Sequence, residues 1–361
     1  MNHAVKQFNR RSVAVLGIES SCDETAVAFL KGDEVSFRLL STAMATQQNI
    51  HKEYGGVVPE VAARIHIETI IPLVKRILGR RVPDCVAVTA GPGLITSLLV
   101  GVHTARALAY IYGKPLVRVN HIEGHIYSNW LATQKPLIKN QRHRLDRIRF
   151  PALALIVSGG HTELILMRDH GKYKKIGKTV DDAAGEAFDK VAKIVDLDYP
   201  GGPAIARRAA YGNSLAVPLP IPMLHSRDFN FSFSGLKTAV LYRVRDQKNH
   251  KTYSEMFRDD ICASFQHSVV TVLVKKTCAA AKHYNVKSVL VGGGVAANIA
   301  LRQTLAKAIP QLPCQPLLFV APLKYCTDNA AMIALAGYIQ FRRGTFTSPL
   351  FCDADPSWEL P

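Results

Sequence analysis

The chain has 361 residues, of which 48% are hydrophobic and 20% are charged. One hydrophobic core rarely serves more than about 250–300 residues, so this length predicts a globular protein of two domains. No apolar stretch reaches the ~18 residues of a membrane span, which excludes an integral membrane protein with helical spans.

Charge and cysteine usage narrow the class further. Lys and Arg number 45 against 28 Asp and Glu, a net charge of +17, which favours a polyanionic partner such as nucleic acid. The seven cysteines include no C-x2-C pair, so neither a zinc ribbon nor a disulfide framework is indicated. The basic N-terminus lacks the apolar region of a signal peptide, and we expect a cytoplasmic protein without a membrane partner.

The N-terminal third predicts strands, a glycine turn and helices. Strands are expected over residues 13–18, 26–30, 33–41 and 85–89. A polar turn between the first two places Asp23 and Glu24 at a strand end. Helices are expected over 59–78, kinked near Pro72, and over 97–112. The first helix has an apolar stripe that we expect to be buried, made of Val61, Ile65, Thr69, Leu73 and Ile77.

Two histidines follow the next apolar strand, residues 116–119. His121 and His125 are four residues apart, so on a helix they share a face and can bind one ion. The expected third donor is Asp328, just before an apolar helix over 330–339. The alternative is that both histidines merely lie on a helix surface.

The second half begins with a basic segment and then repeats the opening pattern. We expect an exposed loop between lobes, either a solvated linker or an RNA contact, whose cations are Lys135, Lys139, Arg142, Arg144, Arg147 and Arg149. Strands over 152–157 and 163–167 then flank a Ser158-Gly159-Gly160 turn. This repeats the strand, polar turn, strand order of residues 13–30 and predicts two lobes of similar build.

Further on, a helix is expected to end near Leu197, and the Pro200–Pro203 segment to turn the chain. Residues 229–237 alternate like a strand, with Ser234 capping the helix that follows. A helical region over 254–284 precedes a strand over 288–291. Three strands thus end in glycine turns, at 91–93, 159–160 and 292–294, where a backbone can approach a phosphate or nucleotide. None fits a P-loop or a dinucleotide fingerprint.

Ten motifs in order resemble the tRNA adenosine threonylcarbamoyltransferases, most closely the bacterial and mitochondrial branch. They begin at residues 19 (ESSCDET), 54 (YGGVVPE), 90 (AGPG), 120 (NHIEGH), 157 (VSGGHT), 182 (DAAGEAFD), 198 (DYPGGP), 231 (FSFSGLK), 292 (GGGVAAN) and 326 (CTDN). The resemblance implies an α/β, actin-like (Hsp70- and sugar-kinase-like) duplicated two-lobe fold with a central cleft. It also implies transfer of threonylcarbamoyl from threonylcarbamoyl-adenylate to adenosine 37 of tRNAs that read codons beginning with A. The basic segment 135–149 is longer than the family pattern, and the tail 347–361 matches nothing in it.

The resemblance also implies site residues and partners. His121, His125 and Asp328 match the family's metal ligands, for one divalent ion per subunit with iron favoured over zinc. The adenylate-binding positions match Ile156, Val157, Ser158, Gly159, Gly160, Asp189, Gly202 and Asn298. Asp23 and Glu24 are candidates to orient or deprotonate the incoming amine, or they cap local backbone. Partners implied are tRNA and either a paralogous scaffold subunit with a small ATPase or, for a mitochondrial type, a second copy of the chain.

We expect residues 1–131, completed by 326–361, to form one lobe, 132–150 the basic inter-lobe loop, and 151–325 the other lobe. Three alternative functions are a metallopeptidase, an actin-like ATPase and a non-catalytic scaffold paralogue. The spacing of Glu123 from His121 disfavours the peptidase, because it puts Glu123 about 200° round the helix. The intact metal-ligand set disfavours the other two.

Overall fold

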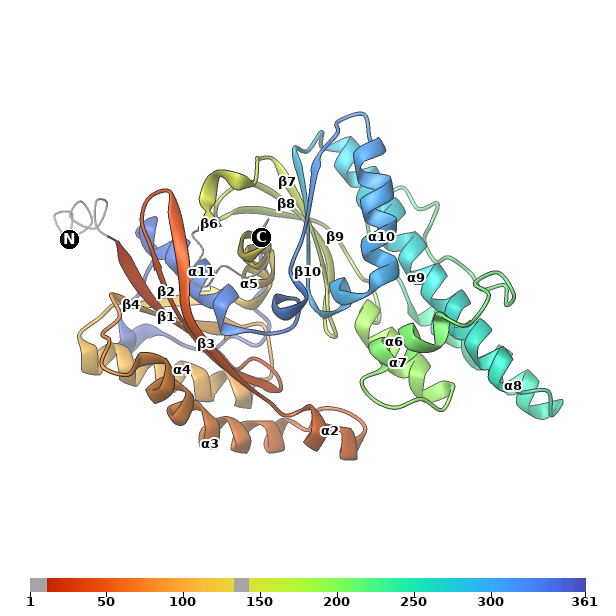
Figure 1. Cartoon of the computed structure of the whole chain (residues 1–361), viewed down its shortest axis with the longest axis horizontal. Coiled ribbons are helices and arrows are strands. Elements are labelled where there is room, and N and C mark those ends of the chain that lie inside the picture. The colour runs from red at the N-terminus through yellow and green to blue at the C-terminus, as the bar shows by residue number, and fades with distance from the viewer. Residues whose placement is uncertain (1–11, 133–142) are drawn as a thin grey trace. The chain divides into compact units, whose positions relative to one another are not determined.

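The computed structural model describes residues 12–132 and 143–361. The described chain divides into two compact units: unit 1 runs to Ile148 and includes Ala321–Pro361, and unit 2 is Arg149–Val320 (Figure 1). Across the described residues, no helix combines the length and the apolar character needed to cross a membrane. The seven cysteines are all free thiols.

Unit 1 is built on a six-stranded sheet with the order β5-β4-β1-β2-β3-β6. Its strands are β1 (Val13–Glu19), β2 (Glu24–Gly32), β3 (Ser36–Thr46), β4 (Cys85–Gly91), β5 (Leu116–Asn120) and β6 (His143–Arg144). β1, β4 and β5 are parallel, whereas β2, β3 and β6 add antiparallel neighbours. β1 and β4 are buried along their whole length, as their unbroken apolar runs predict.

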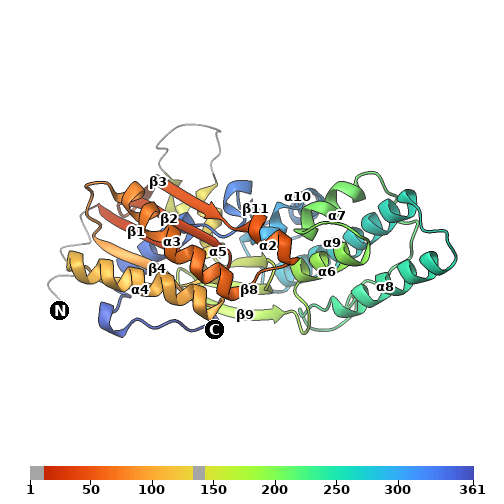
Figure 2. The same ribbon diagram turned by 90° about the horizontal axis from the view of Figure 1, so that it is seen from below.

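Helices cover this sheet. They are α2 (Gln48–Tyr54), α3 (Pro59–Leu78), α4 (Ile95–Tyr112), α5 (His121–Tyr127) and α11 (Ala330–Arg342), with 3-10 turns η1 (Ser128–Leu131), η2 (Leu145–Arg147), η5 (Leu323–Tyr325) and η6 (Pro349–Phe351). α3 and α4 lie side by side against the sheet (Figure 2). α11 packs on β1 so closely that a Cβ at Gly17 would lie 2.6 Å from the Ala334 nitrogen.

The buried stripe of α3 differs from the predicted one. Leu73 and Ile77 are buried as expected, but Val61, Ile65 and Thr69 are only half-buried. Their place is taken by Ala62, His66 and Ile70. His66 tolerates burial because its ring nitrogens lie 2.7 Å from Thr25 Oγ1 and 2.9 Å from the Cys22 carbonyl.

Unit 2 contains a five-stranded sheet with the order β11-β10-β7-β8-β9. Its strands are β7 (Ala152–Val157), β8 (Thr162–Asp169), β9 (Lys172–Lys178), β10 (Ser288–Gly292) and β11 (Leu317–Val320). In unit 1, the first strand, β1, pairs in parallel with β4 and antiparallel with β2. In the same way, the first strand of unit 2, β7, pairs in parallel with β10 and antiparallel with β8. The order and the strand directions repeat those of β5-β4-β1-β2-β3, which confirms the predicted duplicated, actin-like build.

Helices of unit 2 pack on one another and on this sheet. They are α6 (Ala184–Ile194), α7 (Gly201–Ala209), α8 (Ser234–Asn249), α9 (Glu255–His283) and α10 (Ile299–Ala308), with turns η3 (Gly294–Ala297) and η4 (Ile309–Gln311). The predicted turn at 200–203 is wrong, because Gly201 begins α7.

The strand predicted over 229–237 is also wrong: only Phe231 pairs, in a single bridge to Thr179. Nor does the Ser234 side chain cap α8. The Asp181 carboxylate does so instead, accepting from the Phe233 nitrogen at 2.8 Å and the Ser234 nitrogen at 3.4 Å. A carboxylate supplied from 52 residues away replaces the local cap.

Of the basic segment, Lys135, Lys139 and Arg142 lie outside the described residues. The described part up to Ile148 lies in unit 1, whereas Arg149 belongs to unit 2 and its nitrogen donates to Ser288 Oγ at 3.1 Å. β6 pairs with Ser36 and Phe37 of β3, and Ile148 is buried. Arg144 forms a 2.5 Å ion pair with Asp146, and Arg147 donates to the Ala132 carbonyl.

Candidate metal centre and adenylate-binding residues

Helix α5 begins where its sequence supplies a cap. Asn120 ends β5, and its Oδ1 accepts from the Ile122 nitrogen at 2.9 Å and the Glu123 nitrogen at 3.4 Å. The helix that follows places His121 and His125 on one face, as predicted from their spacing. Gly124 lets α5 approach α11, because a Cβ there would lie 2.8 Å from Ile333 Cδ1.

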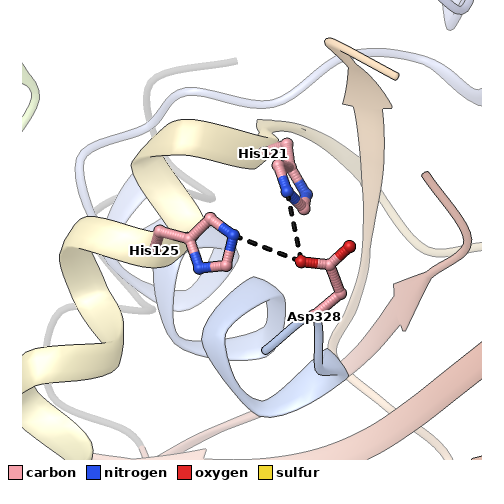
Figure 3. Close-up of side chains that lie close together, drawn as sticks. All are labelled: His121, His125 and Asp328. Atoms are coloured by element: carbon pink, nitrogen blue, oxygen red, sulfur yellow. Dashed lines mark ion pairs between the residues drawn. The ribbon is translucent and has the colours of Figure 1, made fainter. Parts of the chain in front are cut away.

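Asp328 approaches this face from the loop before α11 (Figure 3). Its Oδ1 lies 3.4 Å from His121 Nε2 and 3.2 Å from His125 Nε2. The loop is held by Asn329, whose Nδ2 donates to the Thr327 carbonyl at 2.8 Å and whose Oδ1 caps α11. One potential ligand atom from each of the three residues thus lies within 4.8 Å of the others, and the structure brings together all three predicted metal ligands.

A further carboxylate supports His121 from behind. The Nδ1 atom of His121 lies 3.2 Å from Glu19 Oε2 and 3.1 Å from Ser21 Oγ. Glu19 is fully buried and also accepts from Thr89 Oγ1 at 2.7 Å. A carboxylate on one ring nitrogen leaves the other free to bind a metal and fixes the orientation of the ring. Sequence reasoning gave Glu19 no role, although a carboxylate ending a strand beside the predicted turn was a usable signal.

The pKa values of the three side chains reflect their mutual contact. Burial alone would raise the pKa of Asp328, but His121 and His125 hold it well below its usual range. Burial would lower the pKa of His121, yet the Asp328 and Glu19 carboxylates raise it to about 10. Burial and the neighbouring His121 charge lower the pKa of His125. At neutral pH the Asp328 carboxylate is therefore ionised, and the neutral form of the His125 ring is favoured.

The donor chemistry fits a divalent metal. His125 is fully buried, and neither of its ring nitrogens has a hydrogen-bond partner among the described residues. His125 Nε2 lies 3.2 Å from Asp328 Oδ1, and an ion bound between these two atoms would offset the cost of burying an imidazole without a hydrogen bond. Two imidazole nitrogens and one carboxylate oxygen suit iron or zinc.

Asp23 and Glu24 lie in the same unit, at the turn into β2. Asp23 is half-buried, and burial together with the charge of Asp328 raises its pKa. Glu24 is only 5% exposed; its Oε1 accepts from Thr46 Oγ1 at 2.9 Å, and burial raises its pKa to about 8. Neither of these two pKa shifts was predicted from the sequence.

Glu123 does not complete a peptidase site. It is 4% exposed, and its Oε2 accepts from Gln340 Nε2 of α11 at 2.5 Å. A metallopeptidase needs a carboxylate facing the water on its metal. The carboxylate of Glu123 is instead engaged by α11.

In unit 2, the predicted adenylate-binding residues lie in several segments around the ends of β7 and β10. Ile156 and Val157 are buried at the end of β7, and Gly159 and Gly160 are exposed. Gly293, after the parallel strand β10, packs so closely on this turn that a Cβ would lie 2.3 Å from the Val157 carbonyl. The Ser158 nitrogen, expected to face an anion, donates to the His161 carbonyl at 2.8 Å, so that part of the prediction is wrong.

Of the other three residues, Asp189 and Asn298 make internal contacts. Asp189 Oδ1 accepts from the Gly201 nitrogen at 2.7 Å, which brings Asp189 to the start of α7 beside Gly202. Gly202 has open space where a Cβ would lie. Asn298 caps α10 through the Leu301 nitrogen at 3.0 Å and donates to Gln266 at 2.7 Å.

The glycine turn at 91–93 serves packing within unit 1. A Cβ at Gly91 would lie 1.8 Å from the Asp355 carbonyl oxygen, and one at Gly93 would lie 2.6 Å from the Ser21 carbonyl oxygen. This turn therefore packs against the protein's own backbone, as Gly293 of the third turn also does.

The duplicated sheet topology and the convergent His–His–Asp group define the class: an actin-like α/β protein with a candidate metal centre. The chain belongs to the tRNA N6-adenosine threonylcarbamoyltransferase family, whose sequence profile matches residues 38–335. Relatives with that name are 47% identical in Anoxybacillus flavithermus, over 97% of this chain and 98% of the relative, and 48% identical in Bacillus subtilis, over 93% and 92%.

Solved structures support the fold alone. Full-length HypF in a phosphate- and nucleotide-bound form matches with a TM-score of 0.56 and 14% identity, over 93% of this chain. HypF of T. kodakarensis matches with the same TM-score at 13% identity. This chain spans about half of each HypF chain, 47% and 49%.

Proposed function

We propose that this protein transfers threonylcarbamoyl from threonylcarbamoyl-adenylate to N6 of adenosine 37 in tRNAs that read codons beginning with A. In this reaction the amine attacks the carbamoyl carbonyl carbon, the bond from that carbon to the adenylate oxygen breaks, and AMP leaves with the electron pair. Membership of the family supports the reaction. The observation that carries it is the convergence of His121, His125 and Asp328 on one point.

These three residues are proposed to hold one divalent ion, with iron preferred over zinc on the resemblance to the family. When bound, the ion supplies Lewis acidity that polarises the threonylcarbamoyl carbonyl. Glu19 and Ser21 hold the His121 ring through Nδ1, so that Nε2 faces Asp328. The chain's own contribution is therefore the orientation of the donors.

Asp23 is the better candidate for taking the proton from the attacking amine. It is half-buried and keeps some contact with solvent, whereas Glu24 is almost fully buried and hydrogen-bonded to Thr46. With a pKa near 8, Glu24 carries a proton at neutral pH and is a poor base there. We assign Glu24 the role of a neutral neighbour that keeps Asp23 and Asp328 from facing a third negative charge.

The adenylate is proposed to bind in unit 2 at the ends of β7 and β10. Gly159 and Gly160 are exposed, so their backbone is open to a phosphate. Asp189 and Gly202 lie together at the start of α7, where we propose that the Asp189 carboxylate accepts hydrogen bonds from the ribose hydroxyls. Ile156 and Val157 contribute through the backbone, because their side chains are buried.

The tRNA and protein partners are proposed from charge and surface. A net charge of +17 suits tRNA phosphates. α3 and α4 expose apolar side chains, among them Ile67 (62% exposed) and Ile111 (73%), which suit a protein partner. We propose a paralogous scaffold subunit with a small ATPase, or a second copy of this chain, and a cytoplasmic location.

Nucleoside mass spectrometry tests the proposal. The purified protein is incubated with unmodified tRNA and threonylcarbamoyl-adenylate, with and without candidate partners, and the tRNA is digested to nucleosides. We expect threonylcarbamoyl-adenosine and one AMP per modified base. A tRNA with guanosine at position 37 is the matched control. Absence of product with every partner set, from protein shown to be folded, would refute the function.

A further inference from the structure

The last 15 residues, 347–361, form a C-terminal strap on unit 1 that lies beyond the family profile, which ends at residue 335. Thr347 joins the strap to β5 through two backbone hydrogen bonds with Leu116, of 2.8 and 3.2 Å. Cys352 is fully buried in the hydrophobic core of unit 1. Arg106 of α4 forms a 3.8 Å ion pair with Asp353. The strap is thus an integral part of unit 1.

Its final turn lies against the ends of β4 and β5. The Asp355 nitrogen donates to the Ala90 carbonyl at 2.7 Å, and the Asp355 carbonyl fits against Gly91 where no Cβ can be accommodated. The Arg118 guanidinium carbon lies 5.0 Å from the centroid of the Trp358 ring. These contacts fix the backbone of Trp358 at the point where β5 passes into α5.

The strap contacts the start of α5 through a hydrogen bond between Trp358 and Asn120. Asn120 is fully buried, and its amide has two tasks: Oδ1 caps α5, while Nδ2 donates to the Trp358 carbonyl at 2.9 Å. The strap therefore determines which way the amide faces. α5 has only 7 residues, so it depends on its cap and on packing for stability.

We propose that the strap positions the two histidines of the metal centre, with the Trp358 carbonyl acting through the amide of Asn120. This inference rests on the proposed metal role of His121 and His125. Asn120 and Trp358 are positioning residues, because neither touches the reacting groups. Supporting contacts around metal ligands typically change affinity by ~10–100-fold, and a link through one intermediate residue should give roughly tenfold.

Two variants each remove the hydrogen bond between Asn120 Nδ2 and the Trp358 carbonyl, one by deleting the acceptor and the other by deleting the donor. A chain that ends at Ser357 lacks the Trp358 carbonyl. Asn120→Ser keeps an oxygen that can cap the helix but removes Nδ2, the atom that donates to the Trp358 carbonyl. Because both act on one contact, combining them should weaken metal binding no more than the stronger single change. Arg106→Ala is the matched control, since it removes the ion pair to Asp353 but leaves the Trp358 contact.

Zn²⁺ affinity is measured by competition with a chromophoric chelator, and the visible spectrum of bound Co²⁺ reports the coordination geometry. We expect about tenfold weaker Zn²⁺ binding and an altered Co²⁺ spectrum in both link variants, with Arg106→Ala within twofold of the wild type. Wild-type affinity and spectrum in a folded Asn120→Ser would overturn the proposal, whether or not the shortened chain folds. Equal weakening in Arg106→Ala would also overturn it, because general loosening would then explain the effect.

Amide hydrogen exchange separates this inference from the metal proposal. If the wild-type protein binds neither ion, the proposed metal role is wrong, but the strap still predicts faster exchange at Ile122 and Glu123 in the shortened chain. Those two amides donate to Asn120 Oδ1, so they report the cap directly. Unchanged exchange at both would refute the positioning role without reference to metal.

Discussion

Because of Glu24, we expect the stability of unit 1 to fall as the pH rises from 4.5 to 8. Burial raises the pKa of this carboxyl from an ordinary 4.5 to about 8. Its Oε2 is buried and has no hydrogen-bond partner among the described residues, which favours the neutral form. Between pH 4.5 and 8 the folded protein therefore holds a proton that the unfolded chain has released.

The direction in which the free energy of unfolding changes with pH follows from the linkage between proton binding and folding. The stabilising contribution of neutral Glu24 is fully present below pH 4.5 and is lost as the pH rises through about 8. The free energy of unfolding should fall by up to ~1.4 kcal/mol for each pH unit in this window. Integrated from pH 4.5 to 8, the largest loss in the free energy of unfolding is about 5 kcal/mol.

Glu24→Gln tests this reasoning. Glutamine has the same shape, keeps an acceptor for Thr46 Oγ1 and does not titrate. The variant and the wild type should unfold alike near pH 4.5, and by pH 8.5 the variant should be more stable by several kcal/mol. Glu68→Gln, on the exposed face of α3, is the matched control and should show no such pH-dependent difference.

Urea unfolding followed by tryptophan fluorescence is the assay, with chelator present so that bound metal does not contribute. Both tryptophans, Trp130 and Trp358, lie in unit 1, so the signal reports the unit that contains Glu24. A stability difference between Glu24→Gln and the wild type that stays constant from pH 4.5 to 8.5 would refute the reasoning. It would mean that Glu24 is ionised in the folded protein.

Three further predictions concern the site. His121→Ala combined with His125→Ala should abolish tRNA modification with little change in near-ultraviolet circular dichroism; retained modification without bound metal would contradict a catalytic role. Glu19→Gln should weaken Zn²⁺ binding ~10–100-fold in a chelator competition, because it removes the carboxylate behind His121; wild-type affinity would mean that Glu19 serves packing only. AMP at 100 times its Kd should stabilise the wild type by about 2.7 kcal/mol in thermal unfolding. Asp189→Ala should reduce that protection, and equal protection in Asp189→Ala and Asn298→Ala would count against the proposed adenylate site.

The fold was predictable because its signals are local. The apolar runs that form β1 and β7 are each followed by a polar turn and a second strand, and this repeated order predicts the duplication. β9 (KYKKIGK) escaped prediction because four of its seven residues are lysines, which suit an exposed edge strand but not an apolar pattern. The buried stripe of α3 was misplaced at His66, whose burial depends on partners 41 and 44 residues away.

The candidate metal ligands could be predicted from the sequence, in contrast to the residues around them. The four-residue spacing of His121 and His125 acts through helical periodicity, and Asp328 followed from the resemblance of its motif. Tertiary structure alone decided what supports them. Glu19 is 102 residues from His121, and Trp358 is 238 residues from Asn120. Such contacts depend on how distant segments pack, and no local pattern encodes them.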